Sequence, residues 1–154
     1  MTPTQRYGFA VAFMCSGLVL PAVEVPDECS AIPLDAGMAY IHSPAREACS
    51  EQGLDHLEWA EQIAQAVPSG VRVIYIEAEF FGGTGNQAAV GWQGGVLGFG
   101  PRRTQMPMKD RAGYAVVADQ DDMAINAALR WLGIRRTQTR DEFDTVGIGA
   151  LRNP

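Results

Sequence analysis

Histidine and cysteine are scarce in this sequence. Its 154 residues include two histidines, His42 and His56, and three cysteines, Cys15, Cys29 and Cys49. No cysteine belongs to a C-x-x-C pair and no cluster of histidines supplies further ligands, so we expect no metal and no cofactor. An odd number of cysteines without a dense framework indicates reduced thiols in a cytoplasm, with one bridge and one remaining thiol as the alternative.

Catalytic and nucleotide-binding motifs are also missing. The sequence contains neither G-x-S-x-G nor H-E-x-x-H, and no P-loop lysine follows its glycine-rich stretch. We find no internal repeat and no low-complexity segment. Whether the protein is an enzyme therefore stays open, with a non-enzymatic function favoured and no catalytic residue assigned.

Long apolar runs are absent. The most apolar stretch, residues 8–23, is interrupted by Pro21 and is shorter than a membrane span requires. It has one basic residue ahead of it and no clear small-residue cleavage site after it, so a secretory signal is the less favoured interpretation. We expect a cytoplasmic protein with no membrane partner.

Acidic residues outnumber basic ones, 18 to 12, and give a net charge of −6. This balance argues against direct binding of nucleic acid. The charge is uneven, because residues 1–70 contain nine acids and two bases, whereas residues 71–118 contain three acids and five bases. The acidic half could be a docking face for a basic protein or could serve only solubility.

The stretch from Val71 to Trp92 organises the chain. Its first half is rich in β-branched and aromatic residues, which favour a strand. Strand alternation places Glu77 and Glu79 on one face, roughly 7 Å apart. Two carboxylates at this spacing could lie on the wet face of a sheet, contact a partner or ligand, or act as acid and base.

A glycine-rich turn follows this strand and begins a meander. Gly82, Gly83, Gly85 and Asn86 can adopt the backbone conformations of a hairpin connection, with a phosphate or ligand contact as the weaker alternative. Residues 88–92 and 96–99 read as two further strands, joined by a tight turn at residues 94–95. The next segment, residues 101–113, is predicted to be a loop that contains four bases, Arg102, Arg103, Lys109 and Arg111.

Two helices are expected, over Leu54–Val67 and Met123–Leu132, where apolar residues recur at helical spacing. Asp121 or Asp122 is a candidate cap for the second, and Gly133 ends it. Extended segments are expected at residues 7–14, 17–25 and 37–42. These elements predict one α+β domain over residues 1–154, with residues 1–6 as a loose terminus. Its mostly antiparallel sheet, with the meander at its centre, would be covered on one face by both helices.

Three pieces resemble a known group of proteins when taken together: IEAEFFGGTGNQAAVGW at residues 76–92, AINAALRWLGI at 124–134 and DEFDTVGIG at 141–149. Over about residues 53–150 the chain is similar to small bacterial proteins of the immunity type, which neutralise polymorphic or contact-dependent toxins. The resemblance implies a non-enzymatic acidic protein that binds a basic toxin. We expect a carboxylate-bearing face made by Glu77, Glu79, Asp141, Glu142 and Asp144.

Two other functions stay open. A hydrolase or small-ligand binder would use the same carboxylates beside the turn at residues 82–86, with His42 as a further candidate. A structural component of a phage or secretion assembly would present a large exposed apolar patch and would self-associate. Homo-oligomer formation is open in each case.

Overall fold

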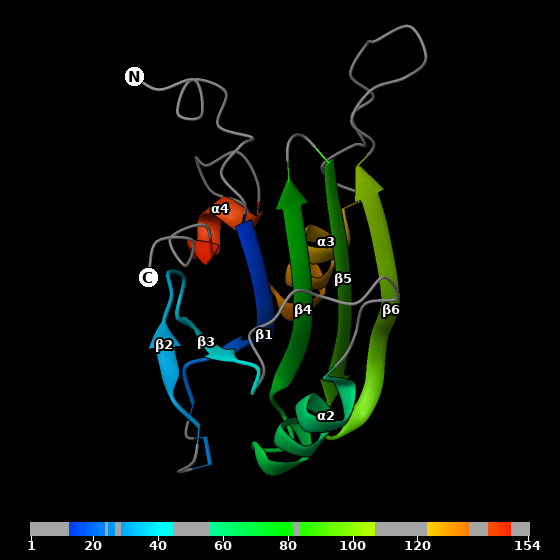
Figure 1. The fold of residues 1–154 in the computed structure, drawn as a ribbon. Helices are drawn as coiled ribbons and strands as arrows, with labels where there is room; N and C mark the ends of the chain where they lie inside the picture. The colour runs from blue at the N-terminus through cyan, green and yellow to red at the C-terminus, as the bar shows by residue number, and fades with distance from the viewer. Residues whose placement is uncertain are drawn as a thin grey trace, which may run out of the picture.

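The protein is built on one antiparallel sheet of six strands (Figure 1). The computed structural model describes residues 13–23, 25–26, 29–44, 56–81, 84–106, 123–135 and 142–148. The strands are β1 (Phe13–Pro21), β2 (Ala31–Pro33), β3 (Met38–His42), β4 (Arg72–Phe81), β5 (Thr84–Gln93) and β6 (Val96–Met106), in the order β2-β3-β1-β4-β5-β6. The helices are α2 (Leu57–Ala66), α3 (Ala124–Leu132) and α4 (Glu142–Val146). The α+β class and the antiparallel sheet are confirmed.

The predicted meander is confirmed as β4, β5 and β6. Its predicted place at the centre of the sheet is wrong, because β6 is an edge strand of the described sheet and β1 and β4 lie at the centre. Gly94 and Gly95 join β5 to β6, and both have positive φ angles, 62° and 78°, which suit a two-residue hairpin turn. The earlier turn is shorter than expected. Gly85 and Asn86 already belong to β5, where they pair with Phe80 and Glu79, so only residues 82 and 83 separate the strands, and both lie outside the described residues.

Strand β6 is longer than expected, because the predicted loop at residues 101–113 begins as strand up to Met106. Pro101 is tolerated there because β6 lies at an edge of the sheet, where a residue without an N–H breaks no ladder. The register between Gly91↔Phe99 and Ala89↔Arg102 sets Gly100 and Pro101 against a single residue of β5, which is a β-bulge. Residues 107–113, with Lys109 and Arg111, lie outside the described residues.

The N-terminal strand is continuous where a break was predicted at residues 15–17. Ser16 and Gly17 pair with Glu77 and Ile76 of β4, so β1 runs through the centre of the sheet between β3 and β4. Tyr40 packs closely on the backbone at position 17, where only glycine fits, because a Cβ there would lie 2.6 Å from the ring carbon Cζ of Tyr40. The strand predicted at residues 37–42 is confirmed as β3.

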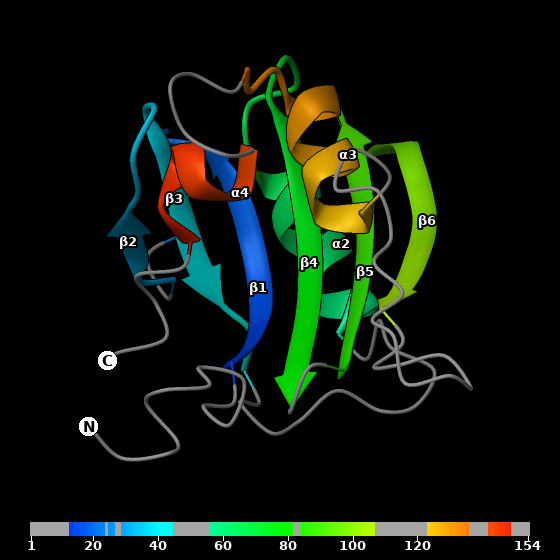
Figure 2. The same ribbon diagram turned by 90° about the horizontal axis from the view of Figure 1, so that it is seen from above.

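The helices lie on opposite faces of the sheet, which corrects the expectation that both cover one face (Figures 1 and 2). The reason lies in the first half of β4, where residues 73–76 place apolar side chains on both faces, and both faces therefore need cover. On one side α2 packs through Ala60, Ile63 and Ala64 onto Val73 and Tyr75. The α3 side packs against Ile74, Ile76 and Ala78.

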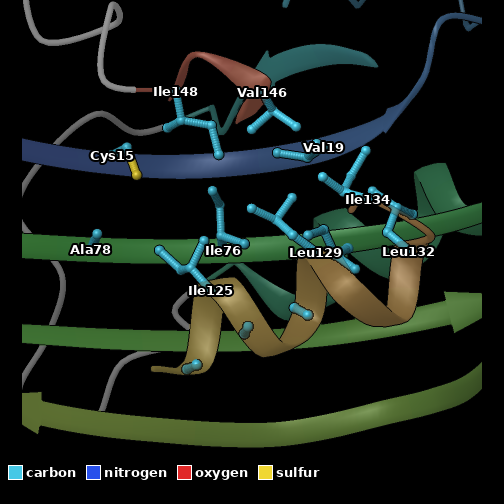
Figure 3. Packing of buried hydrophobic residues seen from close by; sticks show 14 of the residues in the cluster. Cys15, Val19, Ile76, Ala78, Ile125, Leu129, Leu132, Ile134, Val146 and Ile148 are labelled. Carbon is cyan, nitrogen blue, oxygen red and sulfur yellow. The ribbon is translucent and has the colours of Figure 1, made fainter. Parts of the chain in front are cut away.

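The core on the α3 side joins both C-terminal helices to the sheet (Figure 3). Ile125, Leu129 and Leu132 form the buried stripe of α3, and Val146 and Ile148 bring α4 and its following turn into the same cluster. Gly133 ends α3 in a left-handed conformation, φ 109°, as predicted. None of the described helices combines the length and apolar character needed to cross a membrane.

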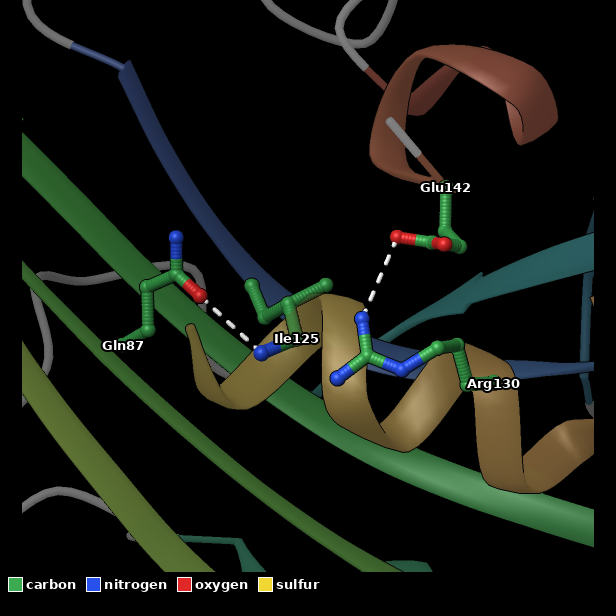
Figure 4. Close-up of polar contacts among 4 residues, drawn as sticks. All are labelled: Gln87, Ile125, Arg130 and Glu142. Carbon is green, nitrogen blue, oxygen red and sulfur yellow. Dashed lines mark hydrogen bonds and ion pairs between the residues drawn. The ribbon is translucent and has the colours of Figure 1, made fainter. Parts of the chain in front are cut away.

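The start of α3 differs from expectation, because the residue at its N-cap is Met123, whose side chain caps nothing. Two strand residues take that role. Thr104 Oγ1 accepts a hydrogen bond from the Ala124 backbone N–H at 3.1 Å, and Gln87 Oε1 accepts one from that of Ile125 at 3.0 Å (Figure 4). The first turn of α3 is therefore fixed to β5 and β6.

Candidate functional site

Glu77, the first predicted site residue, is buried and not on a wet face. It is 2% exposed, although it lies on the same face of β4 as predicted. That face is the α2 side, where Tyr75 belongs to a core cluster. The sequence suggested exposure because the alternation of β4 alone does not indicate that α2 covers this face. Glu77 therefore cannot offer its carboxylate to a macromolecular partner from the described surface.

A chain of hydrogen bonds ends at the Glu77 carboxylate. The Tyr75 hydroxyl donates to Glu77 Oε2. Since this uses the only proton of the phenol, the Ser16 hydroxyl must be the donor in its 3.0 Å contact with Tyr75. Ser43 in turn donates to Ser16 at 2.9 Å. All the donors therefore point the same way, toward the buried carboxylate, and three residues far apart in sequence stabilise it.

Burial raises the pKa of Tyr75 above its ordinary range, and the hydrogen bond to Glu77 raises it further. A backbone hydrogen bond from His56, at the start of α2, acts in the opposite direction. The phenol is thus held in its neutral, donating form. On the other face of the same sheet, burial raises the pKa of the Cys15 thiol to about 12. The buried, fully paired chain that joins Tyr75 to Glu77 is typical of a fixed internal network.

The remaining predicted carboxylates are not gathered on one surface. Glu79 is half-buried on the Glu77 side of β4. Glu142 is 2% exposed on the α3 side, where its Oε1 lies 3.4 Å from the Arg130 guanidinium (Figure 4). Asp141 and the side chain of Asp144 lie outside the described residues. The structure therefore separates Glu77 and Glu142 by the sheet and removes both from a shared carboxylate face.

An acidic surface does exist, on helix α2. Glu58 and Glu61 are exposed, one helical turn apart, and the sequence LEWAEQIAQA has no basic residue. Neither carboxylate has an ion-pair partner within the part of the chain that the structure describes. Sequence reasoning missed this surface, because acids near the start of a helix are also what the helix dipole favours.

Basic and aromatic side chains alternate on the other side of the sheet. The Arg72 guanidinium lies 4.8 Å from the ring centroid of Trp131 and also donates to its backbone carbonyl. Phe99 lies 6.1 Å from Trp131, and Arg102 lies 5.6 Å above Phe99. We call these four residues the cation–aromatic row. Sequence reasoning missed it because its members come from β4, α3 and β6.

Two glycines allow Trp131, in the middle of the cation–aromatic row, to approach the sheet closely. A Cβ at Gly91 or Gly98 would lie 2.6 or 2.7 Å from ring carbons of Trp131, so the indole lies directly on the backbones of β5 and β6. Glycine in a strand often marks such a close approach. Arg72, Arg102, Arg130 and Arg135 are all exposed, so the described surface is basic around α3 and β6 and acidic on α2.

Comparison with known proteins adds no assignment. No protein-family model, no curated protein and no solved structure matches this chain. Among the described residues, no group of three or more His, Cys, Asp and Glu is placed to hold a metal ion. The functional argument therefore rests on the two charged surfaces.

Proposed function

We propose that this chain is a non-enzymatic interaction protein of the immunity type, which binds and neutralises a basic toxin. The observation that carries the proposal is the exposed pair Glu58 and Glu61 on a helix without any base. The partner-facing carboxylates are thereby assigned to α2, in place of the buried Glu77 and Glu142. The resemblance of residues 76–92, 124–134 and 141–149 to immunity proteins supports the same class.

The physical support is electrostatic. Carboxylates on one side of a protein raise the rate of encounter with a basic partner and repel an acidic one. Here the helix that presents them is held rigidly, because Ala60, Ile63 and Ala64 are buried against the sheet. Little ordering of the backbone is then needed when the partner binds, which favours affinity.

An acid–base role for Glu77 has less support. A general acid or base must reach the proton that it transfers, whereas this carboxylate is 2% exposed and accepts the hydroxyl proton of Tyr75 in a hydrogen bond. We therefore favour binding over hydrolysis.

The test begins with a tagged protein expressed in its native host, and captured proteins are identified by mass spectrometry. The expected partner is basic, toxic when expressed alone, and neutralised by co-expression of this chain. Glu58→Lys together with Glu61→Lys should abolish capture and protection. Asp35→Lys at another exposed carboxylate, away from α2, is the control for a change of charge and should leave both intact. Protection that survives the double substitution would contradict the proposed surface.

A further inference from the structure

The outer edge of β6 differs from the opposite edge of the sheet. Among the described strands, β6 has a neighbour on one side only, and it is 11 residues long. The other edge strand, β2, has three residues and ends in Pro33. Short strands and prolines protect an edge from further pairing, and a long edge strand invites it.

The bulge at Gly100 and Pro101 divides β6 into two parts. Before it lie Val96 and Leu97, 69% and 52% exposed, which are the large apolar side chains that stand out most on the described surface. After it, residues 102–106 pair in unbroken register with residues 89–85 of β5. The second part is therefore a regular strand whose outer backbone groups are arranged for one more strand.

The charge of this second part selects its partner. Arg102 and Arg103 are adjacent and exposed, so they lie on opposite faces of the sheet. Arg102 lies on the α3 side at the end of the cation–aromatic row, next to Phe99. An added strand would place every second side chain on the α3 side, beside Arg102. Acidic side chains there would be attracted to Arg102, and basic ones would be repelled.

We propose that the outer edge of β6 at residues 102–106 binds an extended acidic segment of a partner protein by β-strand addition. Main-chain hydrogen bonds to β6 supply affinity, and carboxylates on the α3 side, beside Arg102, supply selectivity. This site is separate from α2 and goes beyond the basic-partner function proposed above.

The strand is held in place before any partner arrives. Thr104 is hydrogen-bonded to the first turn of α3, and Trp131 of the same helix packs over Gly98. Both ends of α3 thus contact β6, on one face, and leave its outer edge clear of α3. A rigid edge lowers the entropy lost when a disordered segment joins it.

A second copy of the chain is the competing occupant. Antiparallel pairing of β6 with itself would bring two pairs of arginines toward the same short interface. Like charges opposite one another destabilise a strand pair, so the charge of the edge favours an acidic segment over self-association.

Fluorescence anisotropy with a short dye-labelled peptide of alternating glutamate and valine tests the proposal. We expect saturable binding that weakens as salt is raised, and no binding of the matching lysine peptide. Arg102→Glu should weaken binding about fivefold, because it turns one favourable cross-strand pair into a repulsive one. Arg135→Glu makes the same change of charge at an exposed site outside β6 and should leave the affinity within about twofold.

Methylated peptides separate strand addition from simple charge attraction. Methyl groups on the amides along one edge of the peptide should abolish binding, and those along the other edge should not, since only one edge faces β6. Equal binding of both methylated peptides would overturn the proposal, as would equal binding to the Arg102→Glu protein. A dimer in sedimentation velocity, together with no peptide binding, would overturn the proposal in favour of self-association.

The two proposed sites fail separately. The Glu58→Lys and Glu61→Lys protein should keep its affinity for the acidic peptide, while Arg102→Glu should still capture the basic partner. Loss of peptide binding alone would overturn the proposed β6 site. Loss of basic-partner capture alone would leave the β6 proposal standing.

Discussion

The side-chain oxygen of Gln87, in the middle of β5, accepts a hydrogen bond from the backbone N–H of Ile125, 38 residues later in the chain. Gln87 is 8% exposed and Ile125 is fully buried. The first amides of a helix have no partner within the helix, so a buried helix start needs an acceptor from elsewhere. The sheet supplies it, and α3 is placed by that contact as well as by its apolar stripe.

Gln87→Leu should therefore destabilise the fold by about 1–3 kcal/mol, because it leaves a buried N–H without its acceptor while keeping the volume of the side chain. The free energy of unfolding in urea measures the effect. Gln62→Leu, on the exposed face of α2, is the matched control and should change stability by no more than about 0.5 kcal/mol. Equal effects of the two substitutions would show that the Gln87 contact contributes little.

Tyr75 predicts a dependence of stability on alkaline pH. Its raised pKa means that the folded protein holds the phenol proton more tightly than the unfolded chain does. The contribution is therefore complete below about pH 10, the ordinary value, and is lost as the pH rises above it. Tyr75→Phe should lower stability at pH 7 by about 1–3 kcal/mol, and the difference from the unaltered protein should shrink above about pH 10.

Because Cys15 also has a raised pKa, the comparison is best made with Cys15→Ala in both proteins. Urea unfolding at a series of pH values then reports on Tyr75 alone. A difference that stays constant across this range would mean that Tyr75 does not lose its proton more readily on unfolding.

Cys15 should react with alkylating reagents only after unfolding. Its thiol is buried between β1 and the α3-side core, and burial raises its pKa to about 12, so little of the reactive thiolate exists at pH 8. We expect iodoacetamide to modify Cys15 at least about a hundred times more slowly in the native protein than in urea. Mass spectrometry of the peptide that contains Cys15 measures both rates, and similar rates would contradict its burial.

Substitutions at Gly91 and Trp131 should have coupled effects on the free energy of unfolding. A Cβ at Gly91 would lie 2.6 Å from an indole carbon, so Gly91→Ala should cost about 1–3 kcal/mol through overpacking. Gly70→Ala, where no atom lies within 4 Å of the added Cβ, is the control and should be close to neutral. With Trp131 first replaced by leucine, Gly91→Ala should lose most of its cost in a double-mutant cycle. An unchanged cost would place the strain elsewhere.

The sequence predicted those structural features that depend on residues close together in the chain. The meander follows from the β-branched run at residues 71–81 and the glycine pair at 94–95, and the end of α3 follows from Gly133. These patterns act within a few positions of the chain, where propensity and turn chemistry decide the conformation.

The candidate sites depend on contacts between distant segments, and there the sequence was insufficient. Glu77 is buried where β1 pairs beside it and where Ser16 and Ser43 join its chain of hydrogen bonds. The cation–aromatic row exists only once α3 has placed Trp131 over Gly91 and Gly98. The extension of β6 past Pro101 likewise depends on its place at the edge, which the residues of β6 do not determine.

Arg130 and Glu142 should connect α4 to α3 more than they bind any partner. The carboxylate is 2% exposed and the guanidinium side chain is 38% exposed, so removing the arginine leaves a buried charge while removing the carboxylate leaves a solvated one. Arg130→Met should therefore destabilise more than Glu142→Gln, by about 1–3 kcal/mol against about 1 kcal/mol, the larger figure being reduced by solvent around the arginine. Hydrogen exchange of the α4 amides should accelerate in both variants. Capture of the basic partner should persist in Glu142→Gln; its loss in a folded Glu142→Gln protein would return the partner-facing role to the C-terminal carboxylates.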